Sequence, residues 1–189
     1  EGAKFYKALK KNGIPAEFVG EVDFFAAPVI RDILAYLRAV DNPLTAGISL
    51  NRIEKINGVP ETVVQKINAV AKKMTWGVQG NDGVFEAMMT AGAVVPDQAH
   101  QIEDITETLE HLIAQKDRFT VSEFIYDLLR NATGLYQRAL TEESGQDLLL
   151  LNTFTRITQD FETITRQGTL NDFLAYLDLL AGVSVEVGE

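Results

Sequence analysis

The chain has 189 residues, of which 46% are hydrophobic and 23% charged, a composition ordinary for a globular protein with one substantial core. Its formal net charge is -10 and its pI is about 4.7, which excludes a protein that coats nucleic acid through a broadly basic surface. It contains no cysteine, which excludes disulfides and thiolate metal sites and agrees with a reducing compartment.

The predicted elements begin with three segments that precede residue 43. Helix formers over residues 4–12 predict a first helix, and an apolar run over residues 16–19 predicts a short β segment. Pro28 suits the first turn of a helix that should run to about Val40, because the apolar residues from there on recur at helical spacing. Asp41-Asn42-Pro43 then stops that helix.

Residues 52–67 predict two short helices joined by a tight hairpin, with Asn57-Gly58 as the break. The stretch from Ile56 to Ile67 aligns without a gap with the L-P-G-V-G-P-K-T-A-E-K-I hairpin pattern of many duplex-binding proteins. A glycine in such a turn allows close approach to a phosphate, and the amides that open the next helix favour an anion. An ordinary helix-to-helix turn is the alternative. The candidate contact residues are Lys55, Asn57, Gly58, Val59, Glu61, Thr62 and Lys66.

The remainder predicts further helices, so the expected fold is a mainly α multi-helix bundle with one short β segment. The glycines of residues 75–83 lack the Lys-Ser/Thr of a phosphate loop, and we interpret this stretch as a flexible linker. Thr120 and Glu123 form a predicted capping box. The predicted helices after the linker are residues 84–91, 97–117, 121–129, 135–140, 146–166 and 170–180, and we expect residues 146–166 to be the core helix.

No catalytic or metal-binding constellation is expected. The chain has no G-x-x-x-x-G-K-[ST] loop, so we expect it to hold no nucleotide. His100 and His111 lie on one predicted helix about 16 Å apart, too far to share a metal ion. No apolar run approaches the roughly 20 residues of a membrane span and no signal peptide is visible, so we expect a cytoplasmic protein without membrane contact. An independent enzyme is the least favoured of the functions.

Several segments together resemble a known family. The run from Gly13 to Gly20, then Asp23-Phe24-Phe25, then residues 30–43 are similar to the part of UvrD/Rep/PcrA-type superfamily 1 DNA helicases that leaves motor domain 2A and enters the inserted 2B subdomain. Residues 151–179 resemble the end of that subdomain. The family's G-I-G turn corresponds to Gly58-Val59-Pro60 here, and Pro60 has no N–H to donate.

The resemblance implies an excised piece of a longer helicase. Residues 1–43 would be a remnant of domain 2A, residues 44–182 a helical 2B-like accessory subdomain, and residues 183–189 the return linker. Implied partners are duplex DNA, bound weakly and without sequence preference, and the motor domains of the same polypeptide. ATP and Mg²⁺ would belong to the parent helicase and no cofactor to this chain, with hinges at Asn42, Pro43 and Gly182. The alternative is a helical protein-interaction or autoregulatory module whose acidic surface binds a basic partner.

Overall fold

The structure is a computed structural model that describes residues 24–75, 78–141 and 145–186. These residues form helices and the turns between them, and no strand occurs within the described ranges. The prediction of a mainly α bundle is confirmed. The expected first helix and the β segment at residues 16–19 lie outside the described residues.

The helices follow one another with short connections. The α-helices are α2 (Pro28–Asp41), α3 (Gly47–Ile56), α4 (Glu61–Met74), α5 (Val84–Met89), α6 (Ala91–Val94), α7 (Ala99–Gln115), α8 (Val121–Asp127), α9 (Leu135–Thr141), α10 (Gln146–Ile164) and α11 (Leu170–Glu186). Within the described residues there are also four single turns, namely η1 (Phe24–Ala26), η2 (Pro43–Thr45), η3 (Pro96–Gln98) and the π-helical turn η4 (Leu128–Ala132).

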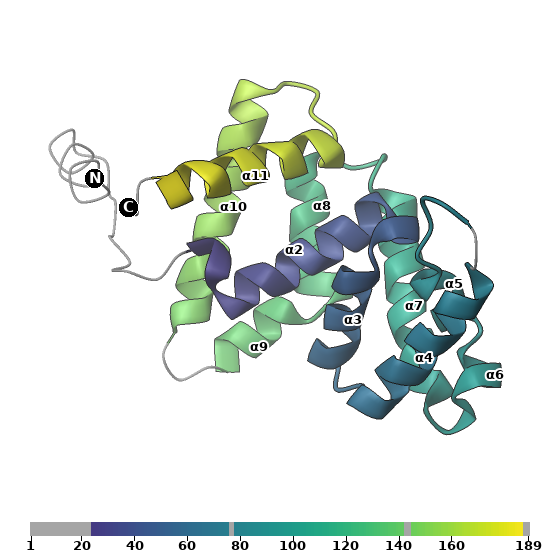
Figure 1. The fold of residues 1–189 in the computed structure, drawn as a ribbon. Helices are drawn as coiled ribbons and strands as arrows, with labels where there is room; N and C mark the ends of the chain where they lie inside the picture. The colour runs from purple at the N-terminus through teal and green to yellow at the C-terminus, as the bar shows by residue number, and fades with distance from the viewer. Residues whose placement is uncertain (1–23, 76–77, 142–144, 187–189) are drawn as a thin grey trace, which may run out of the picture.

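Helix α2 is the centre of the molecule. It lies between a group formed by α3 to α7 and a second group formed by α8 to α11 (Figure 1), and it packs against α3, α7, α10 and α11. Ile30, Ile33 and Leu37 are fully buried, and Tyr36 is almost fully buried beside them. The expectation that residues 146–166 form the core helix is therefore corrected. One stripe of α10 packs inward and Ile164 at its end is 72% exposed, whereas α2 is covered from both sides.

The loop before α5 is held in place by one aspartate, which corrects the expectation of a flexible linker for residues 78–83. The amide of Asp82 donates to the Leu44 carbonyl at 2.8 Å. The Asp82 carboxylate accepts from the Gly47 amide at 2.6 Å and from the Val84 amide at 3.1 Å, and so caps the starts of α3 and α5 together. Gly83 follows with a φ of +72°, and a Cβ there would lie 2.5 Å from the Thr75 Cγ2 atom. Sequence composition did not indicate these contacts.

Two helix ends show how well local signals predict the fold. The capping box of Thr120 and Glu123 at the start of α8 is confirmed. Helix α11, however, continues through Gly182 to Glu186, so residues 183–186, expected as linker, are helical. A single glycine costs a helix only about 1 kcal/mol and does not end it unless a turn follows.

Candidate nucleic-acid interface

The predicted hairpin joins α3 to α4. Helix α3 ends at Ile56, and Gly58 adopts a φ of +81°, a left-handed conformation that favours glycine. The Gly58 amide donates to the Lys55 carbonyl at 3.0 Å and the Val59 amide to the Glu54 carbonyl at 2.9 Å, which closes the end of α3. Pro60, with φ of -60° and ψ of 141°, then directs the chain into α4. The turn thus lies where the sequence placed it.

Side chains from three other helices fix the carbonyl side of this turn. Gln101 on α7 donates to the Asn57 carbonyl at 2.8 Å, and Arg138 on α9 donates to the Ile56 carbonyl at 2.9 Å. The Asn57 side-chain amide donates to the Tyr36 hydroxyl on α2 at 2.8 Å. Asn57 therefore positions the turn from inside, and its side-chain amide is already engaged there. No local pattern could have identified these partners, because they come from helices distant in sequence.

The amide side of the turn faces outward. The Val63 and Val64 amides donate to the Pro60 carbonyl at 2.9 and 3.2 Å, as the first turn of α4 forms. The Glu61 and Thr62 amides precede that turn, and no acceptor for them lies within the described residues. Both residues are exposed. Two outward amides at a helix start, together with the Thr62 hydroxyl, can receive one phosphate oxygen or carboxylate.

The charges around this turn are mixed. The Lys55 ammonium pairs with the Glu61 carboxylate at 2.9 Å, with both side chains more than half exposed, so Lys55 is partly neutralised. Lys66 is exposed one turn further along α4. Lys72 and Lys73 lie in the last turn of α4, about 16 Å from its start. The lysines of residues 55–73 therefore do not form one cluster around the turn.

Buried and exposed positions of the hairpin have different roles. Val59 is 5% exposed and packs into the core with Val63 and Ile67 of α4, so its side chain is structural. Gly58, Glu61, Thr62 and Lys66 are all exposed. Of the seven predicted residues, these four are therefore exposed on the hairpin, and Lys55 lies beside them.

Glu54 is a buried titratable residue that the sequence analysis missed. It is 0% exposed, and neither carboxylate oxygen has a hydrogen-bond partner within the described residues. Burial, with a smaller contribution from Glu61 and an opposing one from Lys55, raises the pKa of this carboxyl from 4.5 to about 7. The signal was present, since Glu54 follows Leu50 by four residues and so lies on the inward stripe of α3.

Other chemistry is limited in the part of the chain that the structure describes. No group of three or more His, Asp or Glu side chains there could hold a metal ion. His100 and His111 each lie near an aspartate, Asp104 at 3.7 Å and Asp127 at 3.4 Å respectively. None of the helices searched is long and apolar enough to cross a membrane.

The described residues define a mainly α domain whose α3–α4 hairpin turns at a glycine and begins α4 with two amides that have no acceptor there. Residues 1–186 match the model of the UvrD-like helicase C-terminal domain, and the chain belongs to this family. Similar proteins include the ATP-dependent DNA helicases PcrA of Staphylococcus epidermidis and Bacillus subtilis, each 28% identical over 185 residues, and that of Staphylococcus aureus, 25% identical. Each alignment covers 94% of this chain and 24% of the relative, so the chain spans about a quarter of their length.

Proposed function

We propose that this chain is the 2B-type accessory subdomain of an ATP-dependent DNA helicase, with the adjoining edge of domain 2A, and that it contacts duplex DNA through the α3–α4 hairpin. ATP, Mg²⁺ and the catalytic groups belong to the motor domains of the longer polypeptide. The observation that carries the proposal is the hairpin itself, in which Gly58 has a φ of +81° and the amides of the exposed residues Glu61 and Thr62 have no acceptor among the residues that the structure describes.

The proposed contact is with phosphates and does not distinguish base sequences. Backbone amides and the Thr62 hydroxyl can donate to phosphate oxygens, which carry no sequence information. Lys66 adds one nearby cation, whereas Glu61 and the net charge of -10 oppose the polyanion. We therefore expect weak binding by this chain alone.

Duplex binding should depend on the hairpin and on few phosphates. Fluorescence anisotropy with a labelled duplex should give a slope of log affinity against log salt of about -2 to -4, at roughly -0.9 per phosphate contact. Gly58→Val should abolish binding, because a β-branched residue at φ of +81° forces the turn to change. Glu61→Gln should tighten binding about fivefold at low salt, because a carboxylate then no longer faces the phosphate.

Gly80→Val is the matched control for the glycine variant. Gly80 has a φ of +79° and open space around it, but it lies in the loop before α5, beyond the far end of α4. The Gly80→Val variant incurs the same backbone penalty without changing the hairpin, and it should bind duplex DNA like the wild type. Two results would instead favour the alternative, an interaction module with a basic partner. One is an equal loss of duplex binding in both glycine variants. The other is no duplex binding by the wild type near 20 mM salt, where the Debye length is about 20 Å.

We further propose that the module swings as a unit within the longer helicase, with hinges at Asn42-Pro43 and Gly182. Phe25 and Ala181 line one hollow, so the start and end of the described chain are neighbours, and two adjacent tethers allow rotation about one axis. Lys116 donates to the Val40 and Asp41 carbonyls at 3.2 and 3.0 Å and so fixes the end of α2 just before Asn42.

The two hinges should not contribute equally. Rotation at Asn42-Pro43 would have to separate α2 from the core that it shares with α3 and α7. Gly182 is exposed, and a side chain there would meet nothing within 4 Å, so no neighbouring atom blocks a change of the backbone angles at this residue. We therefore place the larger rotation at Gly182.

A dye pair in the full-length helicase tests this motion. With one dye at Glu110 and one on the motor, we expect at least two transfer efficiencies whose populations shift when forked DNA is added. Gly182→Ala should slow or reduce the exchange, because alanine favours a continuous helix by about 1 kcal/mol. Gly92→Ala, an exposed helical glycine of α6, is the control. One unchanging efficiency would rule out the swinging module.

A further inference from the structure

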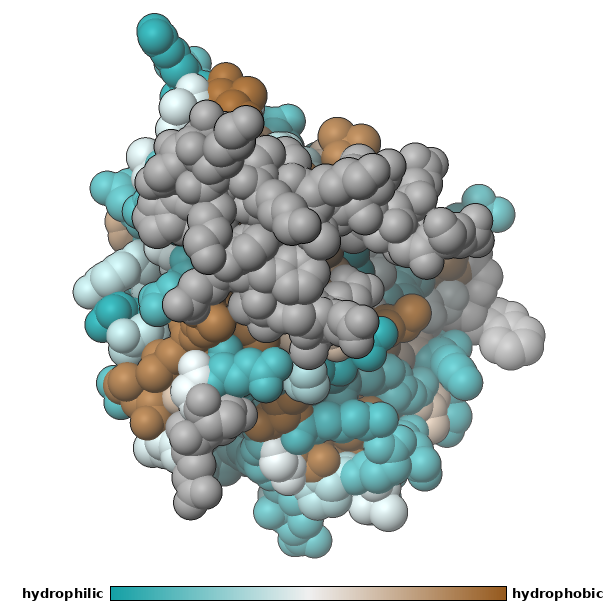
Figure 2. All heavy atoms as spheres, turned by 90° about the vertical axis from the view of Figure 1, so that its left-hand side faces the viewer, coloured by the Kyte–Doolittle hydropathy of each residue, from teal (hydrophilic) through white to brown (hydrophobic). Residues whose placement is uncertain are grey.

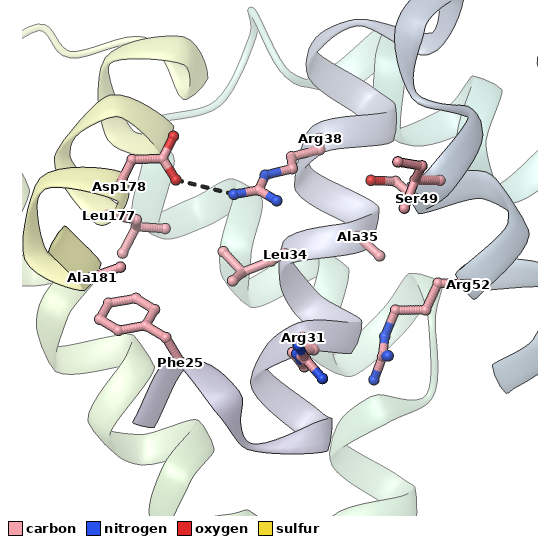
Figure 3. A pocket seen from close by; sticks show the side chains of 11 residues that line it. Phe25, Arg31, Leu34, Ala35, Arg38, Ser49, Arg52, Leu177, Asp178 and Ala181 are labelled. Atoms are coloured by element: carbon pink, nitrogen blue, oxygen red, sulfur yellow. Dashed lines mark hydrogen bonds and ion pairs between the residues drawn. The ribbon is translucent and has the colours of Figure 1, made fainter. Parts of the chain in front are cut away.

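A hollow between α2, α3 and α11 lies away from the hairpin. Its volume is about 480 Å³. Figure 3 shows Phe25, Leu34, Leu177 and Ala181 gathered at one side of it, where α11 crosses α2. Figure 2, seen from the side on which α2 begins and α11 ends, shows apolar and hydrophilic residues next to one another on this side of the molecule. The residues that line the hollow thus give it an apolar wall.

Three arginines surround this apolar wall, although the chain as a whole is acidic. Arg31 and Arg38 come from α2 and Arg52 from α3, and all three line the hollow (Figure 3). Ile48, on the adjoining turn of α3, also lines it and is 90% exposed. Cations and apolar side chains are therefore combined at one place on a protein with a net charge of -10.

The three guanidinium groups differ in how they are engaged. Arg52 is fixed by the Asp32 carboxylate at 2.6 Å and by the Pro28 carbonyl at 3.1 Å. Arg38 pairs with Asp178 of α11 at 3.0 Å, but both side chains are more than half exposed, so this pair is weak and exchangeable. Arg31 is exposed and forms no ion pair within the described residues. Arg31 and Arg38 are therefore available to carboxylates from another molecule.

We propose that this groove, defined by Arg31, Arg38, Leu34, Ile48 and Leu177, binds a short acidic peptide of a partner protein in which an apolar side chain is flanked by carboxylates. The apolar residue would enter between Leu34 and Leu177, and the flanking carboxylates would pair with Arg31 and, in place of Asp178, with Arg38. Arginine suits this role because its planar group pairs with a carboxylate through two parallel hydrogen bonds.

Charge and shape favour a peptide over nucleic acid at this groove. Nucleic acid binding draws its affinity from many neutralised phosphates, and the field of a chain with net charge -10 opposes a long polyanion. The wall is mainly aliphatic, and Phe25 is the only ring among the described residues that line the hollow. Strand-binding surfaces, in contrast, present several aromatic rings for stacking. A short segment with one or two carboxylates meets only the local arginines.

The test uses the whole chain and a short fluorescein-labelled peptide that carries a phenylalanine and a leucine, each flanked by aspartate and glutamate. Arg31→Glu should weaken binding about tenfold, because it replaces the unpaired guanidinium by a carboxylate. Asp178→Asn should tighten binding about twofold to threefold, because it frees Arg38. Arg156→Glu, at an exposed residue of α10, changes the charge by the same amount as Arg31→Glu. It should leave the affinity for the peptide within about twofold of the wild type.

Four results would overturn the proposal. The first is the absence of peptide binding by the wild type, and the second is an equal loss in Arg31→Glu and Arg156→Glu, which would indicate nonspecific attraction. The third is undiminished binding of a peptide with asparagine and glutamine in place of the acids. The fourth is displacement of the peptide by a single-stranded oligonucleotide whose own affinity falls in Arg31→Glu, which would assign the groove to nucleic acid.

Discussion

Glu54→Gln should raise the free energy of unfolding by about 3 kcal/mol near pH 8 and change it little near pH 5. Burial raises the pKa of the Glu54 carboxyl from 4.5 to about 7, so the folded chain keeps a proton that the unfolded chain loses. The contribution of Glu54 to the stability of the wild type is therefore fully present below pH 4.5 and falls by about 1.4 kcal/mol per pH unit up to pH 7. The neutral amide has nearly the same shape and removes this loss.

Urea unfolding of the two proteins across this pH range measures the difference directly. Other carboxylates titrate in both proteins, so only the difference between the two curves reports Glu54. The charges that act on it are Lys55, which lowers its pKa, and Glu61, which raises it. Glu103→Gln, which changes an exposed residue of α7, is the control. Its curve of unfolding free energy against pH should run parallel to that of the wild type. A parallel curve for Glu54→Gln would show that the carboxyl is solvated in the folded protein.

Phe173→Ala should destabilise the protein by about 3–5 kcal/mol, the range for removing a buried aromatic ring. Phe173 is 0% exposed, and its ring centroid lies 5.9 Å from that of Phe154 and 5.2 Å from that of Phe161. These rings join α11 to α10, so the variant leaves a cavity at the contact between the two helices. The amides of α11 should then exchange with solvent faster than those of α3 and α4.

Denaturant unfolding together with hydrogen exchange by mass spectrometry separates this local effect from general loss of stability. Leu179→Ala is the matched control, because Leu179 lies on the same helix and is 70% exposed. We expect it to change stability by less than about 0.5 kcal/mol. If both variants unfolded at the same urea concentration, the aromatic contact would not be what holds α11. Leu177 and Asp178 of α11 line the groove that contains Arg31 and Arg38. Peptide binding at this groove should therefore weaken in Phe173→Ala and not in Leu179→Ala.

Some features of the fold and the site were predictable because their causes are local. The turn at Gly58 is closed by hydrogen bonds to residues three and five positions earlier, and the capping box of Thr120 and Glu123 spans four residues. The inward stripe of α7 follows from helical periodicity, and Ile102 and Leu112 are fully buried. Predictions of this kind need only the spacing of residues along the chain.

The tertiary structure alone decided which surfaces meet. Gln101 and Arg138 hold the hairpin from helices 44 and 82 residues away, and Asp82 caps α3 across 35 residues, distances over which no sequence pattern operates. The same holds for the groove, where Arg38 and Asp178 are 140 residues apart. The sequence by itself determined the helices and the hairpin, because these depend on short-range spacing, and the resemblance of several segments indicated the family. The folded chain decided that α2 is the centre and that Glu54 is buried, because burial depends on which helices pack together.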